Sequence, residues 1–317
     1  MAVATLAAIS AGCGGSIKTT TKTSPQQIPV IHDATREELL AKYNDFAQNV
    51  KSINSTVELK TTAGSKYSGV IDEYHEIKAF LLAQRPSSIR MIGQAPLVGK
   101  TVFDMTSDDK EFHVWIPSKN KFLTGEIGVE RNSSKPLENL RPQHLLDALL
   151  WPTVRKEEAV LFEEFNDENA RYYVLTVLRG GYQTEILRKI WFNRADLNVS
   201  RLQTYGPKGV LLSDVHLSNW QGLVGDQEQT QGASSGVSSF PRSVRIERPH
   251  DDYTLNIEFT KIALNQELSA DKFKLEQPAG SELVVVAQDS DAKPSGDRKQ
   301  ENQNQQHQDQ QHQDQHQ

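Results

Sequence analysis

Apolar and polar residues alternate along much of this chain. The clearest case is residues 253–260, where Tyr253, Leu255, Ile257 and Phe259 are separated by single polar residues. Alternation with a period of two turns every second side chain toward one face of a β-strand, so that one face is buried and the other is solvated. The pattern therefore predicts a half-buried antiparallel strand at this position.

Shorter stretches of the same kind, rich in β-branched and aromatic residues, recur along the chain and are bounded by turn-forming Gly, Asn, Asp and Pro. The strands predicted from them span residues 53–62, 67–82, 88–94, 101–106, 112–116, 121–124, 159–164, 171–179, 185–193, 199–205, 215–217 and 242–247. Together with residues 253–260 they predict a meander of ten or more strands.

Two segments depart from this alternation and show helical spacing. Residues 35–50 repeat apolar residues every three or four positions, and Thr35 with Glu38 forms a capping-box pattern at the start. Residues 142–150 begin with a proline, which suits a first helical turn, and carry a stripe of leucines. We predict one amphipathic helix ahead of the sheet and a second between two groups of strands.

A sheet of this width is not expected to stay flat, because the twist of its strands accumulates. With amphipathic helices on one face it should curl into a partly closed barrel, which makes the fold mainly β with helical cover (α+β). The interior of such a shell is either filled by interleaved side chains or hollow enough to hold a ligand. The pattern leaves both possibilities open.

The chain starts with an apolar run, LAAISAG at residues 6–12, that ends at Cys13, its only cysteine. A run of small residues closed by cysteine resembles the lipobox of bacterial lipoprotein signal peptides, in which the cysteine thiol is acylated. A buried free cysteine is the alternative, but the run stands ahead of every predicted element. We therefore predict a signal peptide at residues 1–12, lipidation of Cys13, and function at a membrane surface.

Composition separates a folded body from two polar ends. Residues 13–32 are rich in Thr, Lys, Ser and Gln and predict a flexible tether, whereas residues 285–317 are rich in Gln, His and Asp and predict a disordered tail. One folded domain is expected over residues 33–284. The net charge is −6 at pH 7 and no basic stripe is present, so nucleic-acid binding is not expected.

The order of these parts resembles the LolA/LolB-like family of outer-membrane lipoprotein carriers and receptors. The resemblance rests on the segment RPSSIRMIGQAPLVG at residues 85–99, on VFD at 102–104 and on a hairpin at Lys119 and Asn120. Near the other end it rests on PRSVRI at 241–246, LNIEFTKI at 255–262, FKL at 273–275 and PAG at 278–280. It implies an unclosed antiparallel β-barrel, which we expect to have about 10–12 strands, with amphipathic helices as its lid.

The resemblance also implies that an apolar cavity receives the acyl chains of lipoproteins or other lipids in the periplasm, without covalent chemistry. The lipidated Cys13 makes the chain more similar to the anchored receptor than to the soluble carrier, and Gly14 lacks the aspartate of inner-membrane retention. Outer-membrane anchoring and a periplasmic carrier protein as partner are therefore expected. In the receptor, a protruding loop docks on the membrane, and Leu97 and Val98 hold that place here; an ordinary tight turn is the alternative.

Strands that are apolar on both faces supply the candidates for the acyl cavity. The residues so chosen are Tyr173, Leu175, Ile190 and Trp191. Trp115 and Trp220 join them because their rings offer broad rigid surfaces to an acyl chain. Each of them has an alternative role as an ordinary filled core position, because most buried aromatic residues simply pack.

The chain contains sequence motifs that resemble those of enzymes, but these motifs lack the secondary structure that catalysis would require around them. Residues 232–236, GASSG, have the spacing of a nucleophile elbow, but they lie in a stretch rich in Gly, Ser and Gln without a strand before or a helix after. The histidines of residues 33–284 are scattered and show no metal-ligand spacing. We expect no catalytic residue, no metal site and no cofactor.

Three functions remain after these considerations. The first, which we favour, is an outer-membrane-anchored lipoprotein that binds acyl chains and takes part in lipoprotein or lipid transfer. The second is an envelope-stress sensor or another protein-binding module on the same fold. The third is a secreted hydrolase, and Ser234 is the only residue that supports it. Bound lipid would support the first function, and a protein partner the second.

Overall fold

The computed structural model describes residues 30–63, 72–73, 76–96, 98–127, 141–167, 170–181, 184–223 and 237–286. The predictions for the signal peptide, for Cys13, for Leu97, for residues 232–236 and for most of the tether and tail fall outside the described residues. No helix within the described ranges is long and apolar enough to cross a membrane.

The described strands form a single sheet of fifteen strands with the order β15-β7-β6-β5-β4-β3-β1-β14-β13-β12-β11-β10-β9-β8, and β2 pairs with the end of β1. Their bounds are β1 Ser52–Ala63, β2 Asp72–Glu73, β3 Ile77–Gln84, β4 Ser88–Gln94, β5 Thr101–Ser107, β6 Glu111–Ile116, β7 Lys121–Glu126, β8 Ala159–Asn166, β9 Arg171–Arg179, β10 Glu185–Asn193, β11 Val199–Tyr205, β12 Leu211–Gly222, β13 Ser239–Arg248, β14 Tyr253–Leu264 and β15 Glu282–Val286.

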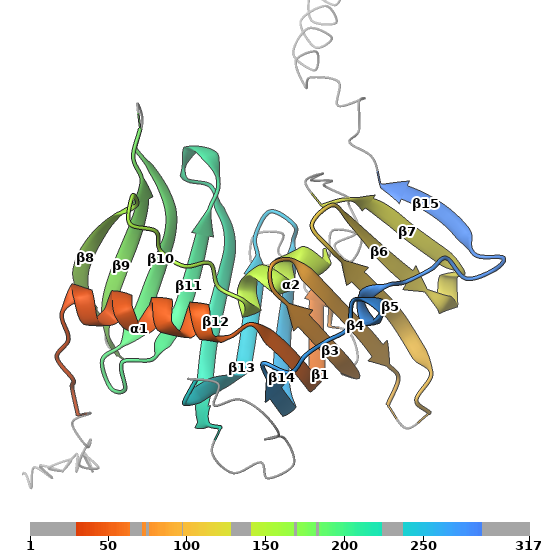
Figure 1. Ribbon diagram of the computed structural model, residues 1–317, viewed down its shortest axis with the longest axis horizontal. Coiled ribbons are helices and arrows are strands. Elements are labelled where there is room, and N and C mark those ends of the chain that lie inside the picture. Colours follow the sequence, from red (N-terminus) through yellow and green to blue (C-terminus); the bar gives the residue numbers. More distant parts are fainter. Residues whose placement is uncertain are drawn as a thin grey trace, which may run out of the picture.

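Strands β8 and β15 stand at the two ends of this order, so the sheet is unclosed, as expected (Figure 1). Three details differ from the prediction. In place of the single strand predicted at residues 67–82, the described residues hold the separate strands β2 and β3, and β3 ends at Gln84. The sheet has fifteen strands rather than 10–12, and β15 runs parallel to β7, whereas every other pair is antiparallel. A five-residue apolar run at the end of a domain gives no local turn signal, and its pairing with a distant edge is a non-local contact that the sequence pattern does not reveal.

The pairing of β1 with β14 joins the two halves of the sheet. It brings residues about 200 positions apart into register from Ile53 opposite Leu264 to Ala63 opposite Tyr253, with a bulge between Thr56 and Val57. On one side of this central pair lies a first arm, β3 to β7 with β15, and on the other a second arm, β8 to β13 (Figure 1).

The two predicted helices lie on the same side of the sheet. Helix α1, Arg36–Asn49, begins with the predicted capping box, in which Thr35 and Glu38 bond each other's backbone N–H, and it crosses the second arm (Figure 1). Helix α2, Pro142–Leu149, lies over the centre of the sheet and contacts β4 and β5. Both helices bury their apolar stripes against the sheet, as the helical spacing predicts.

The main core fills the face of the sheet that carries the helices. Tyr253, Leu255, Ile257 and Phe259, the residues of the clearest alternation, are all buried, and the polar residues between them lie on the outer face. Part of the outer face of the first arm is also covered. There the segment after β14 passes over β4 and β5, where Arg90 donates hydrogen bonds to the carbonyls of Lys272 and Lys274.

Candidate ligand cavity

A cavity of about 370 Å³ lies between the helices and strands β10 to β12, on the inner face of the second arm. Its apolar wall is made by Tyr43 of α1, by Trp151 after α2, and by Leu187, Leu202 and Val215 of the strands. Pockets for small ligands are typically 300–1,000 Å³, mostly apolar and equipped with a few polar groups. The size and lining of this cavity fit that description.

Trp151 occupies the centre of an aromatic stack that partly fills the space under α1. Its ring stacks on Tyr43 at 5.5 Å and on Phe46 at 4.2 Å between centroids, and it is only 2% exposed. The indole N–H donates to the carbonyl of Ala148 at 3.0 Å, and the Tyr43 hydroxyl donates to the carbonyl of Pro152 at 2.9 Å. These bonds fix the ring in place, since both polar groups of the stack are satisfied.

A second, smaller hollow of about 80 Å³ lies on the far side of the same stack. Phe46, Trp151, Trp220 and Val199 contribute to its lining, together with Lys42. Trp220 meets Trp151 edge to face at 6.4 Å, and its indole N–H donates to the carbonyl of Val199. Because Trp151 lines both hollows, its side chain forms part of the wall of each.

An ion cluster centred on the buried Glu158 side chain holds the loop after α2 against the sheet. The Glu158 side chain is 3% exposed and lies 3.1 Å from Arg155 and 3.4 Å from Arg188 of β10, measured between nitrogen and oxygen. Arg188 also donates to the carbonyl of Pro152. All three charged residues line the cavity, so one side of it is polar and charged whereas the wall around Trp151 is apolar.

His144 of α2 lies at another part of the lining and ties the helix to the β13–β14 hairpin. Its Nε2 is 3.1 Å from the Arg248 guanidinium, which can only donate, so Nε2 accepts and the proton resides on Nδ1, 2.9 Å from the Tyr253 hydroxyl. Burial, followed by the nearby charges of Arg248 and Arg141, holds the pKa of His144 well below its ordinary value. His144 is therefore neutral in this arrangement.

The residues predicted to line an acyl cavity are dispersed. Tyr173, Leu175 and Ile190 are buried in the main core and do not line the cavity of about 370 Å³. Trp220 lines the smaller hollow beside Trp151. The structure thus brings one predicted residue next to the hollow space and places three others in packed core.

The remaining two predicted residues lie on the opposite face of the sheet. Trp191 pairs with Arg201 across β10 and β11, and its indole N–H donates to Gln203 at 3.1 Å. Trp115 stands opposite Asp104 on one side and Phe122 on the other, one position out of phase with Val114, which packs on the core. Since strand neighbours alternate between faces, neither tryptophan points toward the helices.

The predicted docking loop is the connection between β4 and β5. Val98 is 77% exposed, whereas Leu97 lies outside the described residues. The loop is closed by hydrogen bonds from Ala95 N to the Lys100 carbonyl and from Gly99 N to the Ala95 carbonyl, with Gly99 at a φ of 63°. Glycine adopts this left-handed conformation at no steric cost, which allows the tight turn that presents Val98 to solvent.

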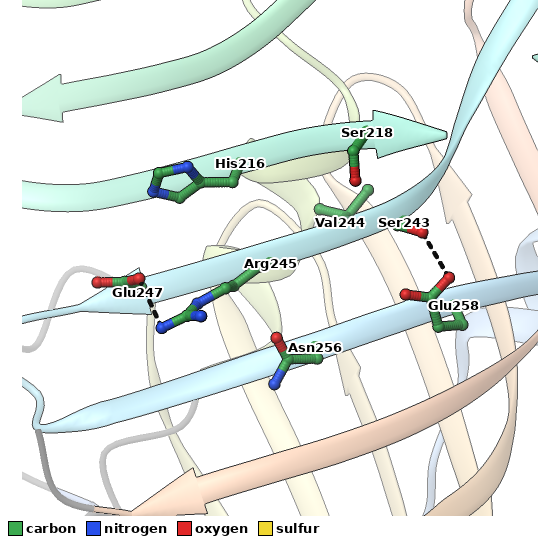
Figure 2. Close-up of a pocket in the computed structure, with 8 residues that line it drawn as sticks. All are labelled: His216, Ser218, Ser243, Val244, Arg245, Glu247, Asn256 and Glu258. Carbon is green, nitrogen blue, oxygen red and sulfur yellow. Dashed lines mark hydrogen bonds and ion pairs between the residues drawn. The ribbon is translucent and has the colours of Figure 1, made fainter. Parts of the chain in front are cut away.

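A third hollow, of about 340 Å³, lies on the outer face of β12, β13 and β14 (Figure 2). Its polar side chains bond to one another: Arg245 pairs with Glu247 at 2.9 Å, and the Ser243 hydroxyl donates to Glu258 at 2.6 Å. His216 and Ser218 lie two positions apart on β12, and within the described residues no hydrogen bond joins their side chains. This hollow has the character of a solvated sheet face rather than of a catalytic site.

Sequence reasoning missed the residues that shape the cavity of about 370 Å³, above all Trp151, Glu158 and Arg188. Arg188 has the same parity on β10 as the core residues Ile190 and Phe192, so its charge points inward. A charged residue in phase with a core stripe was a signal that could have been found. Trp151 directly follows the apolar helix predicted at residues 142–150, and a tryptophan in that place is expected to pack beneath the helix.

No protein-family model and no curated protein matches the sequence. Among solved structures, the chain is similar to a LolA superfamily protein from Nitrosomonas europaea, with 13% identity, a TM-score of 0.45, and coverage of 77% of this chain and 99% of the other. It is similar to a DUF1329 family protein from Desulfovibrio piger, with 15% identity, a TM-score of 0.43, and coverage of 74% and 94%. A domain named for outer-membrane lipoprotein sorting, from Vibrio parahaemolyticus, has 11% identity, a TM-score of 0.43 and the same coverage.

These likenesses, at 11–15% identity, concern the fold alone. The resemblance to LolA/LolB-like proteins that the sequence suggests is confirmed to the extent that LolA superfamily and lipoprotein-sorting domains are among the structural neighbours. Within the described residues, no group of three or more His, Cys, Asp or Glu side chains is placed to hold a metal ion.

Proposed function

We propose that this protein is an envelope lipoprotein that holds acyl chains in the cavity beside Trp151 and takes part in lipoprotein or lipid transfer to the outer membrane. The observation that carries the proposal is the cavity itself, with an apolar wall around Trp151 and charged groups on one side. An acyl chain matches the apolar wall, and its polar end matches the charged residues. Lipidation of Cys13 would hold the domain at the membrane.

The free energy of binding sets a requirement on the size of the hollow. Burial of an acyl chain contributes about 0.8 kcal/mol per methylene. Association costs roughly 4–15 kcal/mol in lost freedom, so a chain must bury on the order of a dozen methylenes to bind well. A cavity of about 370 Å³ is at the small end of ligand pockets. A long chain is therefore expected to need the neighbouring hollow as well.

Trp151 is the side chain that would have to move for this to happen. It lines both hollows, and a rotation of its ring away from Tyr43 and Phe46 would join them. The cost of the movement is the loss of two aromatic stackings, each about 0.5–1.5 kcal/mol beyond burial, and of the indole hydrogen bond to the Ala148 carbonyl, about 0.5–1.5 kcal/mol. An acyl chain entering the space would replace those contacts, so the exchange is feasible.

Docking of the loaded protein on a membrane is assigned to the loop at Leu97 and Val98. Support comes from the exposure of Val98 and from the tight turn that presents it. A Val or Leu side chain gains about 1.5–3 kcal/mol on full transfer from water to hydrocarbon, which biases docking without anchoring the protein.

The test is the lipid content of the full chain carrying Cys13→Ser, which removes the acylation site. The purified protein would be extracted with organic solvent for mass spectrometry, and a fluorescent fatty acid would be titrated into the delipidated sample. Near-stoichiometric acyl species and saturable probe binding are expected. An empty protein that also refuses the probe would contradict acyl binding and would favour the sensor interpretation.

A further inference from the structure

Strand β8 is the edge of the second arm, and it is the most exposed of the strands that make up this arm. It pairs with β9, and no described strand lies on its other side. Seven of its eight residues are exposed, including three large apolar ones: Leu161 at 58%, Phe162 at 39% and Phe165 at 45%. Edge strands with apolar side chains are templates for pairing with another chain, and proteins usually blunt or cover them.

The outer face of β8 presents a short alternating pattern. The register with β9 places Leu161 opposite Thr176, Glu163 opposite Val174 and Phe165 opposite Tyr172. An aromatic platform continues from Phe165 onto the neighbouring strands, where Trp191 meets Phe165 edge to face at 5.2 Å and Tyr172 at 5.7 Å. This face therefore offers an apolar residue at each end of a three-position row.

Glu163 occupies the middle of that row. Its carboxylate makes no ion pair with any residue in the described ranges, whereas its neighbour Glu164, on the inner face, pairs with Arg194 at 2.9 Å. Directly opposite residues on paired strands interact, with opposite charges favourable and like charges unfavourable. In a strand added to β8, a basic residue opposite Glu163 would therefore be favourable and an acidic one unfavourable.

A second copy of this chain fits the edge poorly. In a two-fold antiparallel pair, the register that places Leu161 against Phe165 of the second copy also places Glu163 against the same residue of that copy. The register centred on Phe162 avoids this contact, but it sets Leu161 against the carboxylate of Glu163. Each of these two symmetric arrangements thus opposes like charges or sets a charge against an apolar residue.

We propose that β8 docks an extended segment of another protein by antiparallel strand addition. The segment has a Lys or Arg opposite Glu163, and an apolar residue two positions away on each side, opposite Leu161 and Phe165. Main-chain bonds to the edge give affinity, and the alternate side chains give specificity, as in other cases of strand addition. The surface is separate from the cavity at Trp151 and does not depend on acyl binding.

The test uses fluorescent synthetic peptides and the full chain with Cys13→Ser. In the probe peptide, Thr residues alternate with Val, Lys and Val, and the control peptide carries Glu in place of Lys. Fluorescence anisotropy measures the affinity of the protein for each peptide. We expect the Lys peptide to bind at least tenfold more tightly than the Glu peptide. Glu163→Lys should invert this preference, whereas Glu58→Lys, an exposed charge on the doubly paired strand β1, should leave it unchanged.

Main-chain pairing is tested with N-methylated versions of the Lys peptide. Methyl groups on alternate amides that face the edge should abolish binding, while methyl groups on the other set should not. Equal binding of the Lys and Glu peptides, or equal tolerance of both methylation patterns, would overturn the proposal. So would a concentration-dependent dimer, seen by sedimentation, that keeps the Lys peptide from binding, because the occupant of the edge would then be a second copy.

Discussion

The two arms of the sheet share one architecture but differ in what covers them. In the first arm, residues such as Leu81, Ile89 and Met91 are fully buried beneath α2, and the segment after β14 covers part of the outer face. In the second arm, an aromatic stack leaves hollow space beneath α1, and the edge strand β8 is bare. The first arm is filled beneath α2, whereas the hollows beside the helices and the exposed edge β8 belong to the second arm.

The difference has a local cause. Aliphatic side chains from alternating strand positions interdigitate and fill the space between helix and sheet to high density. Large flat rings such as those of Tyr43, Phe46 and Trp151 stack on one another, and gaps remain where the stack ends. Aromatic packing thus provides burial together with hollows that a flexible chain can enter.

The largest predicted effect comes from emptying equivalent positions in the two arms. Trp151→Ala should lower the free energy of unfolding by about 3–5 kcal/mol and Met91→Ala by about 2–5 kcal/mol, because both remove fully buried side chains. Only Trp151→Ala should also join the two hollows, and it should bind a fluorescent long-chain fatty acid more tightly than the wild type. Urea denaturation and probe titration measure the two quantities.

Trp151→Phe serves as the control, since it keeps the stacking and most of the wall; its probe affinity should stay near that of the wild type. If Met91→Ala changed probe affinity as much as Trp151→Ala, the functional contrast between the arms would be wrong.

Arg85 joins the arms, and its loss has the next largest expected effect. Its guanidinium donates to the carbonyls of Val50 and Ala47 at the end of α1 and of Trp151 after α2, at 2.7–3.0 Å. Arg85→Ala leaves these carbonyls without their donor and should cost about 2–4 kcal/mol of unfolding free energy. Arg85→Lys, which can satisfy one of them, should cost less. Equal stability of the wild type and Arg85→Ala in urea denaturation would contradict this role.

His144, which ties α2 to the β13–β14 hairpin, makes the free energy of unfolding depend on pH. Its pKa is lowered in the folded state from an ordinary value of 6.5. Below pH 6.5 the unfolded chain therefore binds more protons than the folded one, and the stability associated with neutral His144 is lost as the pH falls. The loss amounts to at most about 1.4 kcal/mol per pH unit.

Urea denaturation between pH 7 and pH 5 measures this slope. His144→Gln should flatten it, whereas His250→Gln, in an exposed turn, should leave it as in the wild type. An unchanged slope in His144→Gln would show that other groups dominate acid sensitivity.

Local signals predicted the elements well, because each has its cause within a few residues. The capping box at Thr35, the bounds of β4, β9, β10 and β11, and the burial of the odd positions from Tyr253 to Phe259 all follow from spacing alone. The parallel pairing of β15 and the site of the cavity did not follow, because they depend on contacts far apart in sequence. Tyr43 and Trp151, whose rings stack, are separated by about a hundred residues.

A strand with apolar residues on both faces also does not show which of its faces is the inner one. Tyr173 and Trp191 both belong to strands that carry apolar residues on both faces, yet Tyr173 is in the main core and Trp191 is on the outer face. The phase of a two-sided apolar strand is set by its neighbours, so the sequence of one strand cannot decide it.

The smallest expected effect on stability belongs to the exposed loops of the two arms. The double change Leu97→Ser and Val98→Ser in the first arm should alter unfolding free energy by less than about 0.5 kcal/mol, because Val98 is solvated. Val210→Ser, in the loop between β11 and β12 of the second arm, should be equally mild. Their effects on membrane docking should nevertheless differ, since only the first loop is assigned to docking.

Flotation with phospholipid vesicles, using the chain with Cys13→Ser, measures that docking. The loss of two apolar side chains that enter hydrocarbon only in part should reduce the vesicle-bound fraction about three- to tenfold, equivalent to roughly 0.7–1.4 kcal/mol. Val210→Ser should bind as the wild type does. If both variants lost binding equally, general surface hydrophobicity would account for docking, and if neither did, the loop at Val98 would be an ordinary turn. A selective loss would instead place the membrane contact on the filled arm, beside but not within the arm that holds the cavity.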